Sequence, residues 1–182
     1  SIFFFKSFYL MVLSIALPIA IQNGITNFVN LLDNLMVGRI GTEEMSGVSI
    51  SNQLVFVFNL CIFGTVSGAG IFGAQFFGKK DDEGVKTTTR FKIVAGFVIT
   101  VIASAIFLIF GEKLISLFLT GDSNGGDLDK TLFFAMKYLR IMILGLPGFM
   151  LTQAYSSTLR EGGEAVLPMK AGIAAIFTNL IL

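Results

Sequence analysis

A single carboxylate, Asp33, lies at the end of a long uncharged and apolar stretch near the start of the chain. The stretch runs over Ser7–Leu32. Placing a charged side chain in hydrocarbon is costly, so an ionisable residue within a membrane helix commonly belongs to a cation or proton pathway. Asp33 is therefore the candidate residue for ion coupling. The alternative is a structural ion pair with Lys137 or Arg140, two cations of the fourth apolar segment.

The polar side chains near Asp33 share one face of the same expected helix. At 100° per residue they fall within an arc of about 140°. They are Gln22, Asn23, Thr26, Asn27, Asn30 and Asn34. Hydrocarbon would leave such a face without hydrogen-bond partners, so it must face a water-filled cavity or other helices. We expect Asn30 to assist Asp33 and the other five to line a substrate cavity. Amides that only join neighbouring helices are the alternative.

Pro18 precedes Asp33 in this stretch. Proline has no backbone N–H, so the carbonyl of Ser14 loses its usual helical partner and the helix is expected to bend there. Asp33 precedes Arg39 by about 9 Å along a helix axis, which places it near the end of the helix. A helix that bends and carries one titratable group can couple ion binding to its own shape.

The second apolar run carries two amides and several glycines. Asn52 and Asn59 share a helix face, so we expect them to line the same cavity. The segment GTVSGAGIFGAQFFG contains Gly64 and Gly68, followed by three further glycines. Small residues at this spacing let helix backbones approach closely in lipid. We therefore expect these glycines to pack against other helices.

The elements that must position these residues are membrane helices. Hydrophobic residues make up 54% of the chain, charged residues 14%, and the mean hydropathy is +0.81, which is typical of a membrane protein. A helix needs about 20 residues to cross the hydrocarbon. The apolar runs predict helices over residues 7–38, 45–78, 91–111, 132–160 and 165–182. We expect an all-α fold, a polytopic transmembrane helix bundle. The chain starts without Met and stops within an apolar run, so we expect a fragment.

Basic residues gather between the second and third apolar runs, in the segment GKKDDEGVKTTTRFK. Segments rich in Lys and Arg usually remain on the cytoplasmic side of a membrane. We therefore expect this segment to be a cytoplasmic loop and the N-terminus to be cytoplasmic. The segment TGDSNGGDLDK is expected to be a surface loop on the opposite side.

The composition offers little for catalysis. The chain has no histidine and one cysteine, and no nucleophile lies at a recognisable spacing from a base. We expect no enzyme, no structural metal site and no cofactor apart from a coupling ion. The net charge of +1 gives no indication of a nucleic-acid partner.

Three segments together resemble the multidrug and toxic compound extrusion (MATE) transporters. They are ALPIAIQNGITNFVNLLDNLMVGRIGTEEMSGVS, GTVSGAGIFGAQFFGKKD and YLRIMILGLPGFMLTQAYSSTLREGGEAVLPM. Members of that family consist of two related helix bundles. The resemblance therefore implies that residues 1–182 are a partial N-terminal bundle and that the C-terminal bundle is absent from this chain.

The resemblance also implies a function. It indicates a plasma-membrane antiporter that exports amphipathic, usually cationic compounds in exchange for sodium ions or protons. The family's first helix has a bend-forming proline and an essential aspartate, which Pro18 and Asp33 match. Polar residues of the family's fifth helix also contribute to ion coupling, and Asn179 is the candidate here. The implied partners are small cationic substrates, membrane lipids and the missing half of the same protein.

Two other functions remain open at this point. A lipid-linked oligosaccharide flippase of the same wider superfamily would need Arg or Lys in its cavity to bind pyrophosphate. The expected polar face instead offers amides and one acid, which favours a cationic cargo. A non-transporting membrane scaffold is the second alternative, and it would bury all of these amides in protein contacts.

Overall fold

The described residues of the chain form five helices. The computed structural model describes the backbone of residues 2–39, 41–119 and 127–181, and the side chains of residues 8–29, 31–32, 34–36, 38–39, 41–119 and 127–178. The helices are α1 (Ile2–Gly38), α2 (Thr42–Lys79), α3 (Asp82–Leu119), α4 (Leu128–Glu161) and α5 (Val166–Ile181). The described residues contain no strand. The expectation of an all-α helical bundle is confirmed.

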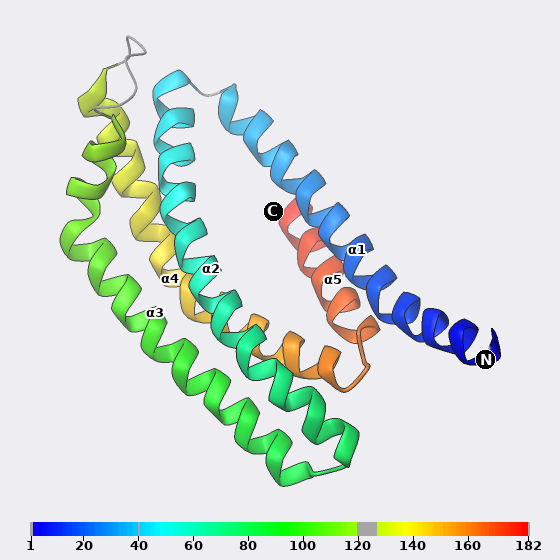
Figure 1. Cartoon of the computed structure of the whole chain (residues 1–182). Coiled ribbons are helices and arrows are strands. Elements are labelled where there is room, and N and C mark those ends of the chain that lie inside the picture. Colours follow the sequence, from blue (N-terminus) through cyan, green and yellow to red (C-terminus); the bar gives the residue numbers. More distant parts are fainter. Residues whose placement is uncertain (1, 40, 120–126, 182) are drawn as a thin grey trace.

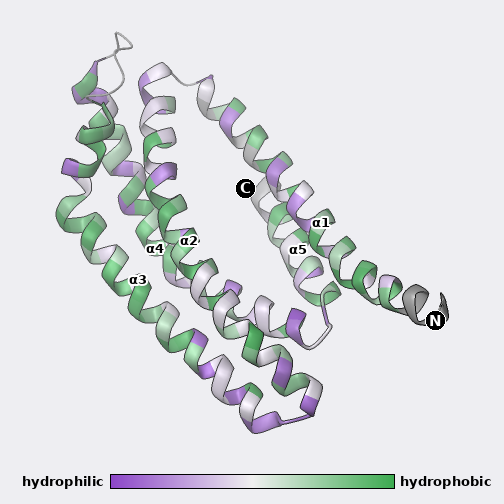
Figure 2. Ribbon diagram, in the orientation of Figure 1, coloured by the Kyte–Doolittle hydropathy of each residue, from purple (hydrophilic) through white to green (hydrophobic). Residues whose placement is uncertain are grey.

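Four of these helices are long and apolar enough to cross a membrane. The candidate spans are Phe8–Met36, Thr42–Lys79, Asp82–Leu119 and Leu128–Glu161. Figure 2 shows hydrophobic residues over most of α3, and hydrophilic residues gathered at the turn between α2 and α3. Since the backbone hydrogen bonds of a helix are satisfied internally, such segments are stable in lipid. The chain is therefore a multi-pass membrane protein.

The helices form two groups. Helices α2, α3 and α4 pack side by side, with the most extensive contacts between α2 and α4, whereas α5 lies along α1 (Figure 1). Ile62 of α2, Ile115 of α3, and Leu139 of α4 have no exposed surface and lie in the core of the three-helix group. Helix α1 also makes a smaller contact with α2.

Helix α2 approaches the backbone of α4 closely at Gly47. A Cβ added to Gly47 would lie 2.9 Å from the backbone nitrogen of Ala135 and 3.0 Å from the carbonyl oxygen of Thr131. The single O–H of Ser51 lies within hydrogen-bonding distance of two carbonyl oxygens, those of Gly47 (2.9 Å) and Ala135 (3.0 Å), which share it as acceptors. Small residues therefore let the two backbones come together, as is usual in membranes.

The glycines that the sequence singled out do not all make such contacts. A Cβ on Gly64 or Gly68 would meet nothing within 4 Å, and the same holds for Gly78. Within the described chain, the expectation that Gly64 and Gly68 pack against another helix was wrong. Helix spacing alone shows which residues share a face but not which face meets a neighbour. Gly70 and Gly73, in the same segment, are buried.

The expectation of a loop over GKKDDEGVKTTTRFK was also wrong. Only Lys80 and Asp81 separate α2 from α3. Lys80 adopts a left-handed backbone conformation (φ 57°), and a carboxylate oxygen of Asp81 accepts a hydrogen bond from the backbone of Gly84 at 3.0 Å. Negatively charged side chains stabilise the first turn of a helix, and Asp82 and Glu83 lie in the first turn of α3. Helix α3 therefore begins well before residue 91, where hydropathy alone predicted its start.

Helices α3 and α4 also extend beyond the expected ranges at the opposite end. Helix α3 continues past residue 111 because Ile115 and Leu119 are buried against the core. Helix α4 begins at Leu128, after Asp127, whose side chain accepts a hydrogen bond from the backbone of Lys130. The side-chain hydrogen bond from Lys130 lowers the pKa of Asp127, and the backbone hydrogen bond acts in the same direction.

We predict that Gly47→Ala destabilises the protein although alanine is the better helix former. The added methyl group would overlap backbone atoms of α4, which cannot move as a flexible side chain would. The expected cost is about 1–3 kcal/mol, seen as a lower midpoint in thermal unfolding of the detergent-solubilised full-length protein. Gly64→Ala is the matched control in α2, and its midpoint should not fall. Equal midpoints for the two variants would contradict the close approach.

Candidate functional site

The residues expected to couple an ion lie outside the described side chains. The backbones of Asn30 and Asp33 belong to α1, and that of Asn179 belongs to α5. Helix α1 continues without interruption through Pro18. The coupling role of the three side chains, the bend at Pro18, and an ion pair between Asp33 and the exposed Lys137 or Arg140 of α4 therefore stay predictions.

The remaining polar residues of the first expected helix lie on α1 as a mostly exposed face. Asn23, Thr26, Asn27 and Asn34 are exposed, and Gln22 is partly buried. The hydroxyl of Thr26 donates to the carbonyl oxygen of Gln22 at 2.9 Å. Such a bond competes with the backbone hydrogen bonds of the helix. Their role in lining a cavity stays a prediction.

The two amides of the second run lie on α2. Asn52 accepts a hydrogen bond from the hydroxyl of Tyr138 in α4 at 3.2 Å. Asn59 is partly buried. Among the described side chains, no hydrogen bond joins either amide to the polar face of α1. The structure therefore assigns Asn52 a contact with α4, and the shared cavity stays a prediction for both residues.

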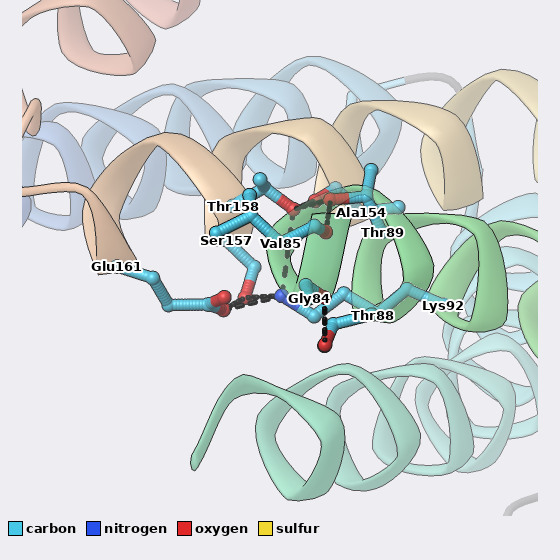
Figure 3. Close-up of polar contacts among 9 residues, drawn as sticks. All are labelled: Gly84, Val85, Thr88, Thr89, Lys92, Ala154, Ser157, Thr158 and Glu161. Atoms are coloured by element: carbon cyan, nitrogen blue, oxygen red, sulfur yellow. Dashed lines mark hydrogen bonds and ion pairs between the residues drawn. The ribbon is translucent and has the colours of Figure 1, made fainter. Parts of the chain in front are cut away.

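The structure brings together a polar cluster that the sequence did not single out. We call it the polar junction, and it consists of Lys92 in α3 and of Ser157, Thr158 and Glu161 in α4. Lys92 has no exposed surface, and its ammonium group forms an ion pair with Oε1 of Glu161. The same ammonium lies 3.4 Å from the hydroxyls of Ser157 and Thr158, and Ser157 donates to Oε1 at 2.5 Å. Figure 3 shows Lys92 reaching from α3 toward these groups.

Helix α2 packs against the polar junction at two glycines, Gly70 and Gly73, which have no side chain. A Cβ on Gly70 would lie 2.7 Å from Oε1 of Glu161, and a Cβ on Gly73 would lie closer still to Oε2. The carboxylate therefore occupies the space that side chains would fill at these two positions. Oε2 is buried and has no hydrogen-bond partner among the described groups. Any larger residue at Gly73 would have to displace the carboxylate.

The preceding residue, Arg160, points to a different helix. Its Nη2 donates to Oε1 of Gln22 in α1 at 2.8 Å. The amide nitrogen of Gln22 lies against α5, since a Cβ on Gly172 would be 2.7 Å from it. Adjacent residues at the end of α4 therefore bind opposite neighbours, Arg160 to α1 and Glu161 to α3.

A cavity of about 280 Å³ adjoins these residues between α2 and α4. Its lining is mixed, with the apolar side chains of Phe63 and Val66 and several polar groups. The polar lining residues are Ser67, Gln153, Ser157, Arg160 and Glu161. A polar cavity of this size has room for several water molecules.

The arrangement provides charge compensation and hydrogen bonding rather than covalent chemistry. Burying Lys92 without a partner would be very costly, and Glu161 with the two hydroxyls provides the partners. Among the described residues, no group of three or more His, Cys, Asp or Glu side chains could hold a metal ion. The polar junction therefore holds α3 against α4.

The sequence did contain signals for this cluster. Ser157 and Glu161 are one helical turn apart in SSTLRE, and Lys92 lies between the apolar residues Phe91 and Ile93. Lys92 is also the last residue of the segment GKKDDEGVKTTTRFK, for which the charges predict a cytoplasmic loop. The structure instead places Lys92 inside α3, and a loop prediction contains no information on the burial of this side chain.

Comparison with known proteins gives one consistent relationship. The MatE family model matches residues 18–182. The probable multidrug resistance protein NorM of Thermotoga maritima is 24% identical over 93% of this chain and 35% of its own length. The probable multidrug resistance protein YoeA of Bacillus subtilis is 27% identical over 91% and 34%, respectively. The multidrug export protein MepA of Staphylococcus saprophyticus is 25% identical over 92% and 36%.

The chain thus spans about a third of the length of these curated relatives. No solved structure gives a significant match.

We predict that Lys92→Met destabilises the full-length protein by about 3–5 kcal/mol, because it leaves the buried carboxylate of Glu161 without its counterion. The double variant Lys92→Met with Glu161→Gln should recover most of this loss, since both charges are then absent. Thermal unfolding in detergent measures both effects.

The control is Lys86→Met, because the ion pair of Lys86 with Glu83 is exposed. Its effect should stay below about 1 kcal/mol. If Lys92→Met unfolds at the same temperature as Lys86→Met, the polar junction does not stabilise the helix group.

Proposed function

The chain belongs to the MatE family, and from this membership we propose that it is part of a secondary antiporter that exports drugs or other toxic compounds. The proposed cargo is amphipathic and cationic, and the proposed counter-ion is sodium or a proton. The names of the relatives support export of drugs, and the polar face of α1 supports the charge of the cargo and the coupling to a cation.

The polar face of α1 is the observation that carries this proposal. Helix α1 is apolar enough to span a membrane, yet Asn23, Thr26, Asn27 and Asn34 are exposed on it. Polar groups on a membrane helix need water or protein partners. A water-filled cavity shared with the rest of the protein would satisfy them, and Asp33 would supply its negative charge. Such a cavity attracts cations and repels anions.

Exchange follows from competition for this carboxylate. A sodium ion or proton that binds Asp33 neutralises the charge that holds a cationic cargo. The cargo is then released, and loss of the ion on the other side restores the charge. The membrane potential adds about 2.3 kcal/mol for each charge moved through 100 mV. A bend at Pro18 that depends on occupancy of Asp33 would link this exchange to the shape of α1.

The charges favour this proposal over a lipid-linked oligosaccharide flippase. A pyrophosphate cargo requires cations that are free to bind it. The polar face of α1 carries amides and one acid rather than such cations, and the charge of Lys92 in the helix group is compensated by Glu161. The scaffold alternative requires protein contacts for the amides, whereas Asn23 and Asn27 are exposed in the described chain.

We further propose that the protein lies in the plasma membrane with its N-terminus in the cytoplasm. The end of α2 and the first turns of α3 carry Lys79, Lys80, Lys86 and Arg90. A concentration of cations at one end of a helix pair favours the cytoplasmic side. The start of α1 and the end of α4 lie at the same end of the molecule as this turn (Figure 1).

Asp33→Asn tests the proposed function in the full-length protein. Asparagine keeps the size of the side chain but cannot be titrated, so we expect gradient-driven efflux of a cationic dye from vesicles to be lost. The protein should still insert and remain folded. Asp129→Asn, a change of an exposed carboxylate at the start of α4, should leave efflux intact. Wild-type efflux by Asp33→Asn, with the same ion dependence, would refute the coupling role of Asp33.

Labelling tests the proposed orientation. Cysteines at Lys80 and Asp129 in a Cys61→Ala background lie at opposite ends of the helix group. Impermeant thiol reagents added to intact cells should label the cysteine at position 129, and the cysteine at position 80 should react only after the membrane is opened. The reverse pattern would show the opposite orientation. Labelling of both cysteines from outside would refute the prediction that α3, which lies between positions 80 and 129, crosses the membrane once.

A further inference from the structure

A hydrogen bond ties α1 to the end of α4 at Gln22. Gln22 receives it from Arg160, and the residue after Arg160, Glu161, is fixed by the buried ion pair with Lys92. The backbone of Arg160 is therefore held in place by the three-helix group. Gln22 belongs to the other group, which consists of α1 and α5 (Figure 1). The bond thus joins the two helix groups at one pair of side chains.

Gln22 lies one helical turn after Pro18, where α1 is expected to bend. Pro18, one turn earlier, cannot donate a helical hydrogen bond, and Gly24 has no side chain and nothing within 4 Å of an added Cβ. The hydroxyl of Thr26 competes for the carbonyl of Gln22. A bend at Pro18 would therefore displace the turn that contains Gln22 relative to the part of α1 before the proline.

The partner of Arg160, Gln22, is a neutral amide, and this affects how easily the contact between α4 and α1 can break. A carboxylate at position 22 would form an ion pair with Arg160 that is hard to break inside a membrane. An amide gives a charge-assisted hydrogen bond that is directional but does not neutralise the guanidinium. The bond can therefore form and break without leaving a second charge unpaired.

The Arg160 side chain also has other possible hydrogen-bond acceptors when its bond to Gln22 breaks. Its Nε is buried without a hydrogen-bond partner among the described groups, and its side chain lines the cavity that Ser67 and Gln153 also line. These side chains can accept hydrogen bonds from a guanidinium. Arg160 thus shares a cavity with further hydrogen-bond acceptors, which it could bind when Gln22 is released, as a two-state contact requires.

We propose that Arg160 is a positioning residue for α1, whose hydrogen bond to Gln22 holds α1 against the end of α4 and breaks when α1 changes shape during transport. This inference rests on the proposed function for its role in transport. The contact itself, and its effect on the position of α1, do not depend on which compound or ion is carried.

Spin labels test the effect on position. The full-length protein with Cys61→Ala receives labels at Leu13→Cys in α1 and Phe97→Cys in α3, which are both exposed positions. Gln22→Met and Arg160→Met each remove the bond. We expect both to shift the distance distribution by the same amount, with the population of the wild-type distance falling about tenfold. Arg160→Lys keeps a donor and should retain the wild-type distribution.

Gln75→Met is the control, because Gln75 is an exposed glutamine of α2. It should leave the distribution unchanged. Wild-type distances in both Gln22→Met and Arg160→Met would overturn the proposal. Since each variant changes a different helix, a common shift cannot result from misfolding of one of them alone.

Dye efflux tests the role in transport. Gln22→Glu replaces the neutral acceptor by a carboxylate, so α1 should be held more firmly and the maximal efflux rate should fall about tenfold. A wild-type maximal rate would overturn the role in transport. If the wild-type protein itself moves no dye, the proposed function fails, while the distance measurement still decides whether Arg160 positions α1.

Discussion

The buried ammonium group of Lys92 is the constraint on which the packing of the three-helix group depends. A charge with no exposed surface in a membrane helix must be neutralised by protein groups. Glu161 and two hydroxyls of α4 do so, which sets the register between α3 and α4 at this level. The carboxylate then needs space on its other side. Gly70 and Gly73 of α2 leave that space, so all three helices are fixed by one charge pair.

The same pair defines what is fixed and what can move in the proposed antiporter. Because the ion pair with Lys92 holds Glu161, the backbone of the neighbouring Arg160 is fixed. The Arg160 side chain can then bind or release Gln22 of α1. Helix α1 carries the polar face on which the proposed exchange depends, and it lies with α5 outside the three-helix group (Figure 1). The buried charge pair and the polar face of α1 thus belong to different helix groups, and the hydrogen bond from Arg160 to Gln22 is one of the contacts between these groups.

The sequence was informative about helices and much less informative about their contacts. Long apolar runs predicted an all-α membrane bundle, because the length and hydropathy of a membrane helix are local properties. The ends of α3 were not predicted, since the polar residues from Asp82 to Lys92 are helical without being apolar. The burial of Lys92 depends on Glu161, far along the chain, and hydropathy contains no information on such pairs. For the same reason Gly64 and Gly70, in one glycine-rich segment, have different surroundings.

The tight turn between α2 and α3 has a consequence for the handling of this protein by proteases. A protease needs several residues of extended chain around the bond that it cuts, and exposed flexible loops usually supply them. The segment with Lys79, Lys80, Lys86 and Arg90 has many trypsin recognition residues, but only Lys80 and Asp81 lie outside helices. Trypsin recognition sites are therefore dense where cleavable backbone is scarce, and the folded protein resists digestion at its most basic segment.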